Sequence, residues 1–400
     1  MKTVYLDSAS NTPMDEGVFK AMKPYFTGGF VGNSHSAHNY GYEALKIVNE
    51  ARHLVGNTFG VISKNVLFTS GATESNNFVI KALAMRELAK RPVKEQKRHI
   101  VCGATEHASV LNPLEQLKTM GFKITYVKPD NAGVVRTKDV VEAFTDKTLL
   151  VCIMDINNEL GTQNEAMMVA AEARERKIIS LIDCTQSFSC GGESLLLRNK
   201  FPEGDFFSFS THKLYGPTGA GGLICLRDQF DLLQGYALIS GGSQEDSLRG
   251  GTSNLAGIVG TSVALDILYH NSLEDFYNGL YSYLLESLDA KIGRESYKLN
   301  AIPAHKNIVS IDFSNYIKVD SLANSLAMYG VAVSAGSACD ADHDETQGGF
   351  NPSHVLLAIG LNEEQIRNSI RISFNKYNTK KDIDYFIEQL INLHNDMCVE

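Results

Sequence analysis

The chain has 400 residues, of which 44% are hydrophobic and 21% charged, and its formal net charge is −9. This composition is typical of a globular protein, and the length favours two or three domains around a large core. The acidic balance, without a dense run of lysine and arginine, argues against nucleic acid as a direct ligand. No apolar stretch approaches the roughly eighteen residues of a membrane span, and the N-terminus lacks a signal-peptide core. We therefore expect a soluble, unsecreted, cytoplasmic protein with no membrane partner.

The seven cysteines are odd in number, scattered, and form no CxxC pair. Most lie in apolar runs, as Cys152 does in 149–154, so buried reduced thiols are expected for all but one. The exception is Cys339, whose neighbours are small and polar. Because the histidines are not at metal-ligand spacings either, we expect no metal site.

From residue 64 to 226, short β-rich runs alternate with longer helical patterns. Such alternation predicts an α/β fold in which helices cover a mainly parallel sheet. The seven predicted strands are 65–69, 99–102, 123–127, 148–154, 178–182, 205–210 and 221–226. The predicted helices between them are 73–88, 111–120, 138–144 and 166–176. We assign this seven-stranded sheet to one large domain that spans residues 15–255.

After the glycine-rich stretch 241–251, an amphipathic pattern without proline predicts one long helix over 253–288. Beyond it the sequence predicts the strands 307–313, 331–333 and 369–374, and the helices 320–328, 353–359 and 380–395. These elements predict a smaller α+β C-terminal domain over 256–400. The N-terminal segment 1–14 is expected to pack with this small domain.

Two polar residues follow predicted strands, at the end where α/β proteins bind their ligands. Lys213 follows the strand 205–210, and a lysine there can form a Schiff base when burial and a nearby cationic nitrogen lower its pKa from about 10.4. Asp183 follows the strand 178–182, where a carboxylate can pair with a pyridinium nitrogen. The alternatives are a surface lysine and an aspartate that caps a helix. Together the two residues favour pyridoxal 5′-phosphate (PLP), which requires both groups.

Three further segments lie at strand ends. Residues 70–76 open a helix whose backbone N–H groups can approach a phosphate, although a capping box through Ser70 or Thr73 explains them equally well. His107 lies just past another strand, where an imidazole can stack on a flat ring, but a lone histidine is often structural. Asn158 either binds the phenolic oxygen of the cofactor or belongs to a plain Asn/Gly turn.

Several motifs, in one order along almost the whole chain, resemble those of the NifS/IscS-type cysteine desulfurases. These enzymes belong to the class V aminotransferase group of fold-type I PLP-dependent enzymes. The motifs are Tyr5-Leu6-Asp7, Gly32-Asn33, 68–75, Thr105-Glu106-His107, Asn157-Asn158-Glu159, Asp183 with Thr185-Gln186, Ser210 with His212-Lys213, Gly241-Gly242, Arg249 with Gly251-Thr252, Ser337-Ala338-Cys339 and Ser369-Ile370-Arg371. The resemblance implies the PLP-dependent transferase fold, removal of sulfur from L-cysteine to give L-alanine, and a homodimer.

The resemblance also implies a role for each matching position. Lys213 would hold PLP covalently, Asp183 would pair with its ring nitrogen, and His107 would stack on the ring. The implied ligands of the phosphate are Ala72, Thr73, Ser210 and His212, together with Thr252 of the neighbouring subunit. The residues implied around the phenolic oxygen and the substrate are Gln186, Asn158, Asn33 and Arg371. Arg371 would bind the substrate carboxylate, a task suited to a guanidinium fork.

Cys339 lies in 334–352, a run rich in small and acidic residues that predicts a flexible loop. The resemblance makes Cys339 the nucleophile that receives the sulfur as a persulfide and delivers it to a sulfur-acceptor protein. Acidic neighbours such as Asp340 and Asp342 oppose ionisation of a thiol whose ordinary pKa is near 8.5. The loop therefore has to carry the thiol to a place where it is better activated.

The sequence departs from the family pattern at two places. The family's Asn-Pro-Ser-Ser-x-His motif is Asn-Ser-His-Ser-Ala-His at 33–38, and its small residue after the strand-end aspartate is Cys184, for which packing is expected. The alternative functions are a selenocysteine lyase, another class V aminotransferase, or a scaffold that has lost the reaction. Iron–sulfur cluster assembly, tRNA thiolation and sulfur modification of DNA all remain open as the destination of the sulfur.

Overall fold

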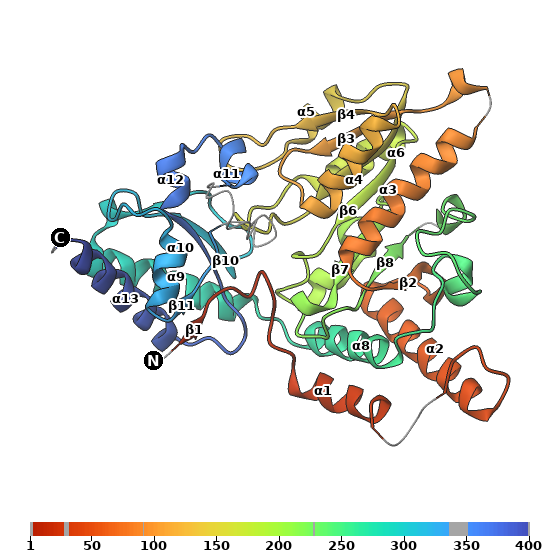
Figure 1. Cartoon of the computed structure of the whole chain (residues 1–400), viewed down its shortest axis with the longest axis horizontal. Coiled ribbons are helices and arrows are strands. Elements are labelled where there is room, and N and C mark those ends of the chain that lie inside the picture. Colours follow the sequence, from red (N-terminus) through yellow and green to blue (C-terminus); the bar gives the residue numbers. More distant parts are fainter. Residues whose placement is uncertain (1–2, 28–31, 91, 227–228, 336–350, 399–400) are drawn as a thin grey trace, which may run out of the picture.

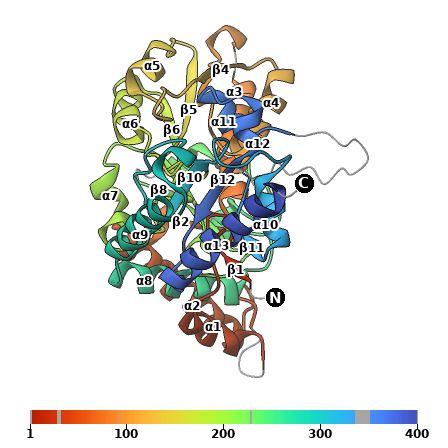
Figure 2. The ribbon, with the colours of Figure 1, turned by 90° about the vertical axis from the view of Figure 1, so that its left-hand side faces the viewer.

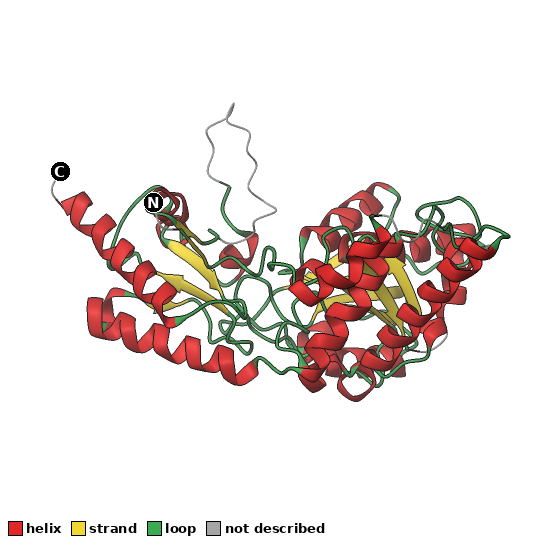
Figure 3. Cartoon of the chain, turned by 90° about the horizontal axis from the view of Figure 1, so that it is seen from below, coloured by secondary structure: helices red, strands yellow, loops and turns green. Residues whose placement is uncertain are grey.

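The computed structural model describes residues 3–27, 32–90, 92–226, 229–335 and 351–398. Its elements form a larger part around one long sheet and a smaller part that contains the C-terminal helix (Figure 1). Seen from below, the strands of the two parts form separate groups, and loop segments lie between them (Figure 3). Among the described helices, none combines the length and the apolar composition needed to cross a membrane.

The larger part is built on a seven-stranded sheet with the order β2-β8-β7-β6-β5-β3-β4. Its strands are β2 (Val66–Thr69), β3 (His99–Gly103), β4 (Lys123–Val127), β5 (Thr148–Met154), β6 (Ile179–Asp183), β7 (Phe206–Ser210) and β8 (Gly221–Cys225). Only β8 runs antiparallel to its neighbours β2 and β7. All residues of β5 are buried, as expected for a strand that helices cover on both faces. The predicted α/β class and the mainly parallel seven-stranded sheet are confirmed.

Helices cover both faces of this sheet. They are α2 (Asn39–Phe59), α3 (Ala72–Ala89), α4 (Ala108–Thr119), α5 (Thr137–Glu142), α6 (Ala166–Glu175), α7 (Leu197–Lys200) and α8 (Leu255–His270), while α1 (Glu16–Met22) packs against α8. One buried cluster joins the strands to α3 and α4, and another joins them to α2, α6 and α8. Because alternate strand residues belong to the two clusters, the sheet separates two apolar layers.

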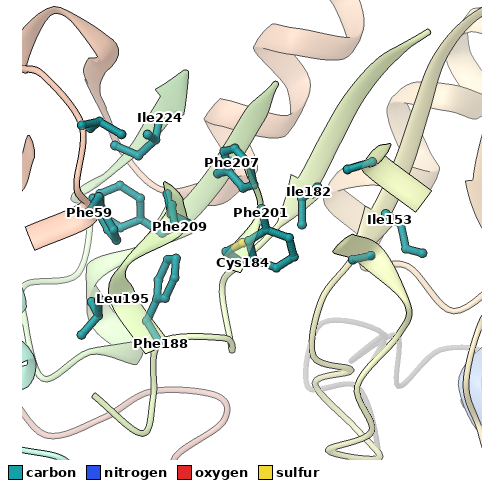
Figure 4. Close-up of a cluster of buried hydrophobic side chains, with 14 of the residues drawn as sticks. Phe59, Ile153, Ile182, Cys184, Phe188, Leu195, Phe201, Phe207, Phe209 and Ile224 are labelled. Atoms are coloured by element: carbon teal, nitrogen blue, oxygen red, sulfur yellow. The ribbon is translucent and has the colours of Figure 1, made fainter. Parts of the chain in front are cut away.

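Cys184 belongs to the second of these layers. It is fully buried, and Figure 4 shows it among Ile182, Phe201 and Phe207. Burial raises the pKa of its thiol well above the ordinary value. A buried protonated thiol among aromatic rings is unreactive, so Cys184 fills space in the core.

The single helix predicted over 253–288 is wrong, because the chain forms two helices there. α8 ends at His270, and α9 (Glu274–Ile292) begins after a short break. Asn271 in this break has an extended backbone, and its side chain donates to Ile267 O at 2.6 Å. The hydroxyl of Ser272 accepts a hydrogen bond from Glu274 N at 3.4 Å. Such side-chain contacts compete with the helical hydrogen bonds, and they let α9 turn towards the smaller part.

The smaller part holds the antiparallel sheet β12-β10-β9 (Figure 2). Its elements are β9 (Lys298–Leu299), β10 (Ile308–Asp312), β12 (Ser369–Ser373), α9, α10 (Leu322–Met328), α11 (His354–Ala358), α12 (Glu363–Arg367) and α13 (Lys380–Cys398). The N-terminal strand β1 (Val4–Tyr5) pairs in parallel with β11 (Val331–Ala332) on this side of the molecule. From β1 the chain crosses to the larger part, and residues 7–15 therefore run between the two.

Candidate active site

A cavity of about 270 Å³ opens at the carboxyl ends of β5, β6 and β7, next to the first turn of α3. The predicted site residues that line it are Ala72, Thr73, His107, Asn158, Asp183, Gln186, Ser210, His212, Lys213 and Arg371. Sequence reasoning missed other lining residues, which are Ala9, Ser10, Ser109, Met154, Ile156 and Thr185. Strands that end at one edge of a parallel sheet therefore bring together residues that lie far apart in the sequence.

Three predicted residues do not line this cavity. Asn33 and Thr252 are exposed, and they lie on neighbouring segments because Ser34 Oγ is 3.3 Å from Ser253 Oγ. Cys339 lies outside the described residues.

Lys213 ends a 3₁₀ turn, Thr211–Lys213, that directly follows β7. Its Nζ donates to the carbonyl of Ala9 at 2.7 Å and also to the carbonyl of Ser10. The surface-lysine alternative is therefore wrong, since the ammonium group lies at the cavity and is bound by the N-terminal segment. Burial, together with the charge of Lys213, lowers the pKa of His212 to about 4. The imidazole of His212 is consequently neutral at physiological pH.

The turn that carries Lys213 is held by the same N-terminal segment. Thr12 donates to the carbonyl of His212 through both its N (2.8 Å) and its Oγ1 (2.9 Å). The Oγ1 of Thr12 also accepts a hydrogen bond from Tyr215 N at 2.8 Å. Thr12 is about two hundred positions from His212 and Tyr215 in the sequence. Its contacts with the residues on either side of Lys213 hold the lysine turn in place.

Asp183 is the last residue of β6, and only 6% of its surface is exposed. Its Oδ1 accepts hydrogen bonds from the N (2.9 Å) and Oγ1 (2.5 Å) of Thr185, and its Oδ2 accepts one from Asn76 Nδ2 (2.9 Å). The N-cap alternative is wrong, because these contacts form a local turn and no helix begins there. Three donors thus hold the carboxylate of Asp183, which lines the cavity.

The first turn of α3 borders the cavity without a side-chain cap. Its N-cap residue is Gly71, with φ of 149°, so the capping-box alternative through Ser70 or Thr73 is wrong. Ala72 N donates to Ser210 Oγ at 2.8 Å. A Cβ at Gly71 would lie 3.1 Å from the same Ser210 oxygen. A helix N-terminus with small residues and an adjacent hydroxyl is suited to an anion such as a phosphate.

His107 is the N-cap of α4, and its Nδ1 accepts a hydrogen bond from Ser109 N at 3.0 Å. The structural role that a lone histidine often has is therefore present here. His107 also lines the cavity. Capping fixes the orientation of the imidazole towards the cavity.

Arg371 lies in β12 with only 2% of its surface exposed. Its Nη2 donates to Asp7 Oδ1 and to Ser10 Oγ, both at 2.7 Å, and its Nη1 donates to the carbonyl of Asn158 at 2.8 Å. Its Nε is buried and has no partner among the described residues. The smaller part thus inserts one cation into the wall of the cavity, and one donor of this cation is unsatisfied among the described residues.

Glu106 lies behind His107 and is fully buried. Its Oε1 accepts a hydrogen bond from Met154 N at 2.8 Å, and its Oε2 has no partner in the described part of the chain. Burial raises its pKa from 4.5 to about 8; the Met154 N–H opposes this rise, and the charge of Asp183 adds to it. Glu106 is therefore mostly protonated at neutral pH, and it acts as a neutral brace between two strand ends.

The sheet has the strand order of the fold-type I PLP-dependent transferases. As in those enzymes, a lysine and an aspartate lie at the ends of neighbouring strands. The chain belongs to the aminotransferase class-V family, whose model matches residues 4–386. The family resemblance drawn from the sequence motifs is thereby confirmed.

Named relatives agree with this assignment. A cysteine desulfurase IscS of Rickettsia prowazekii (strain Madrid E) is 36% identical over 387 residues, which cover 96% of this chain and 89% of the relative. The cysteine desulfurase IscS of Haemophilus ducreyi (strain 35000HP / ATCC 700724) is 36% identical over 392 residues, or 96% and 91% of the two chains. A solved NifS-like protein has a TM-score of 0.82 and 30% identity over 100% of both chains. A structure of SspA in complex with cysteine has a TM-score of 0.78 and 32% identity, over 94% of this chain and 100% of that chain.

Proposed function

We propose that the protein is a PLP-dependent cysteine desulfurase, which removes sulfur from L-cysteine, releases L-alanine and keeps the sulfur as a persulfide on Cys339. The observation that carries the proposal is the meeting of Lys213, Asp183, His107 and Arg371 in one cavity, in a chain of this family. The cysteine desulfurases among its relatives support the choice of substrate.

The cavity fits the cofactor at each of its functional groups. Lys213 Nζ would hold it covalently, Asp183 would pair with its ring nitrogen, and His107 would lie on its ring. Its phosphate would be held by the open N–H groups of the first turn of α3, with Ala72, Thr73, Ser210 and His212 around it, while Gln186 would lie beside the phenolic oxygen. When bound, PLP supplies an electron sink for cleavage of bonds at the substrate's α and β carbons.

Arg371 is the group that binds the substrate carboxylate, because it is a buried cation that lines the cavity and its Nε has no partner among the described residues. Asn158 lines the cavity beside it and holds the guanidinium through its carbonyl. With the carboxylate at Arg371 and the amino group towards Lys213, the substrate lies between the two parts of the molecule. Lys213 Nζ is then the group that moves the Cα proton.

The sulfur step needs no added oxidant or reductant. Cys339 Sγ forms a bond to the substrate sulfur while the substrate Cβ–S bond breaks, and the electron pair stays with Cβ. Cβ then takes a proton, so that a thiol and L-cysteine become a persulfide and L-alanine.

The described residues on either side of the Cys339 segment support this role, because one contacts a residue of the site and the other contacts a residue next to it. Ser334 exchanges main-chain hydrogen bonds with Arg371, at 2.7 and 3.2 Å. Ser353 Oγ donates to Glu159 Oε2 at 2.6 Å, next to Asn158. The described residues on the two sides of the segment therefore contact Arg371 and Glu159, the neighbour of Asn158. The persulfide then passes to an acceptor protein.

A homodimer completes the site. Thr252 and Asn33 are exposed on neighbouring segments and do not line the cavity of their own chain. In the dimer, Thr252 reaches the phosphate of the second copy, and the Asn33 segment lies beside it.

The test uses purified protein with PLP and L-cysteine, and it measures alanine and the mass of the Cys339 peptide. We expect the wild type to produce alanine and a persulfide. Cys339→Ala should keep its bound cofactor but produce neither over repeated turnovers. Cys398→Ala is the matched control and is expected to behave as the wild type. Full-rate alanine production by Cys339→Ala would overturn the sulfur step, and turnover of selenocysteine alone would favour a selenocysteine lyase.

A further inference from the structure

Asn76 lies behind the cavity wall, in the second turn of α3, and is fully buried. Its Nδ2 donates to Asp183 Oδ2 at 2.9 Å and to Ser109 Oγ at 3.0 Å. Its Oδ1 has no partner among the described residues. The opposite orientation of the amide would set an oxygen against the Asp183 carboxylate, so only one orientation of this side chain is favourable. A buried amide whose oxygen has no hydrogen-bond partner lowers the stability of the fold. The function of Asn76 therefore lies in its two donor contacts, to Asp183 and to Ser109.

The hydrogen bonds that continue from Asn76 have a fixed direction. Ser109 N donates to His107 Nδ1 at 3.0 Å, which makes this ring nitrogen an acceptor. Because Asn76 already donates to Ser109 Oγ, the hydroxyl proton of Ser109 is directed to His107 Nδ1, 2.9 Å away. The neutral imidazole of His107 therefore carries its proton on Nε2.

We propose that Asn76 is a positioning residue that joins Asp183 to His107 through Ser109. The proposal rests on the proposed function in one respect, because it takes Asp183 and His107 as the residues that hold the cofactor ring. Thr185 holds Oδ1 of Asp183, and Asn76 holds Oδ2, so the carboxylate cannot rotate. One side chain of α3 thereby sets the group at the ring nitrogen and the group on the ring face together.

The first test measures the affinity of the protein for PLP. The cofactor is removed, then titrated back and followed by its visible absorbance. Asn76→Ala deletes one of the three donors to Asp183, and we expect PLP to bind about tenfold more weakly, because a hydrogen bond to a charged group contributes about that factor. Wild-type affinity in Asn76→Ala would overturn the proposal.

Asn77 provides the matched control, since it is the next residue of the same helix. Its Nδ2 donates to the main-chain carbonyls of Thr73 at 3.0 Å and Ser109 at 3.4 Å, and it does not contact Asp183. We expect Asn77→Ala to bind PLP within about twofold of the wild type. A loss in Asn77→Ala as large as that in Asn76→Ala would show a general effect of the helix and overturn the specific role.

A double-mutant cycle on PLP affinity tests the link from Asn76 to Ser109, the residue that contacts His107 Nδ1. Ser109→Ala removes the hydroxyl link but keeps the N–H that binds His107 Nδ1. If one path joins the three side chains, the losses of Asn76→Ala and Ser109→Ala are less than additive in the double variant. Additive losses would overturn the connection.

Asn76→Asp extends the test to a variant of the same shape. It replaces the donor by an acceptor 2.9 Å from the Asp183 oxygen, so we expect a larger loss of PLP affinity than in Asn76→Ala. This variant also serves if Asn76→Ala does not accumulate in folded form, and wild-type affinity in it would overturn the proposal. A wild-type protein that binds no PLP would instead overturn the proposed function. A wild type that binds PLP and desulfurates cysteine, beside unchanged Asn76 variants, would overturn the role of Asn76 alone.

Discussion

Tyr215 connects the turn of the candidate active-site lysine to the smaller part of the molecule. It lies two residues after Lys213, its backbone φ is 60°, and its ring is buried. Its hydroxyl lies 2.7 Å from the hydroxyl of Tyr277 in α9, and it accepts a hydrogen bond of 2.8 Å from Lys376 N. A non-glycine residue in the left-handed region is strained and persists only where its surroundings hold it. This bridge is therefore expected to stabilise the fold measurably.

Tyr215→Phe is expected to lower the free energy of unfolding by about 2 kcal/mol. The substitution keeps the ring but leaves the buried hydroxyl of Tyr277 and the half-buried N–H of Lys376 without a partner among the described residues. A buried polar group that loses its hydrogen-bond partner costs about 1–3 kcal/mol of stability. Two groups lose their partner here, but the N–H of Lys376 is only half-buried, so we expect a total near the lower end of the range for two groups. The assay is urea unfolding of the PLP-loaded protein, followed by circular dichroism.

Tyr277→Phe is the matched control, because it removes only one of the two partners of the Tyr215 hydroxyl. We expect it to cost about 1 kcal/mol. The double variant no longer has an orphaned tyrosine hydroxyl, so its loss should be about 1 kcal/mol less than the sum of the single losses. Strictly additive losses, or a larger loss for Tyr277→Phe than for Tyr215→Phe, would refute the bridge.

Three further predictions concern the cavity. Arg371→Lys keeps the charge but loses the planar guanidinium that contacts Asp7, Ser10 and Asn158, so the KM for L-cysteine is expected to rise about 10- to 100-fold with a smaller change in kcat; an unchanged KM in steady-state assays would contradict the carboxylate role. Because the pKa of Glu106 rises from 4.5 to about 8 in the folded protein, the folded state holds a proton that the unfolded state releases, and stability falls as pH rises between these values. Urea midpoints across this range should show that Glu106→Gln removes most of the fall, and an equal slope in both proteins would contradict the assignment. Gly71→Ala places a Cβ 3.1 Å from Ser210 Oγ, and an absorbance titration should show PLP affinity reduced by about tenfold, whereas retained affinity would contradict the phosphate role.

The sequence predicted the sheet well because most of its strands, though not β4, are buried on both faces. Their residues therefore form continuous apolar runs that end in polar residues, and Asp183 and Lys213 stand at two such ends. The same topology explains why residues from separate strand ends meet at one cavity. The helix α2 was not predicted, although its buried residues recur at helical spacing. The break at Asn271 could not be predicted from the apolar pattern, because side-chain hydrogen bonds end the helix there.

The contribution of the N-terminal segment could not be predicted from local sequence. Ala9 and Ser10 act through their main-chain carbonyls on Lys213, and any residue type supplies a carbonyl. In the sequence, Asn76 likewise appears only as a residue in the middle of a helix, and 107 residues separate it from its contact Asp183. Such partners become visible only when the chain is folded, because no spacing or composition marks them.

The contacts of Arg371 limit how a substrate carboxylate can bind. A guanidinium binds both oxygens of a carboxylate through two neighbouring N–H groups, and Nε needs Nη2 as its neighbour. Both protons of Nη2 are engaged here, one by Asp7 and one by Ser10. A carboxylate that uses Nε in a fork must therefore displace one of these two contacts. Because Ser10 also accepts a hydrogen bond from Lys213 Nζ through its carbonyl, a shift of Ser10 would change a contact of the lysine that we propose as the proton-transfer group.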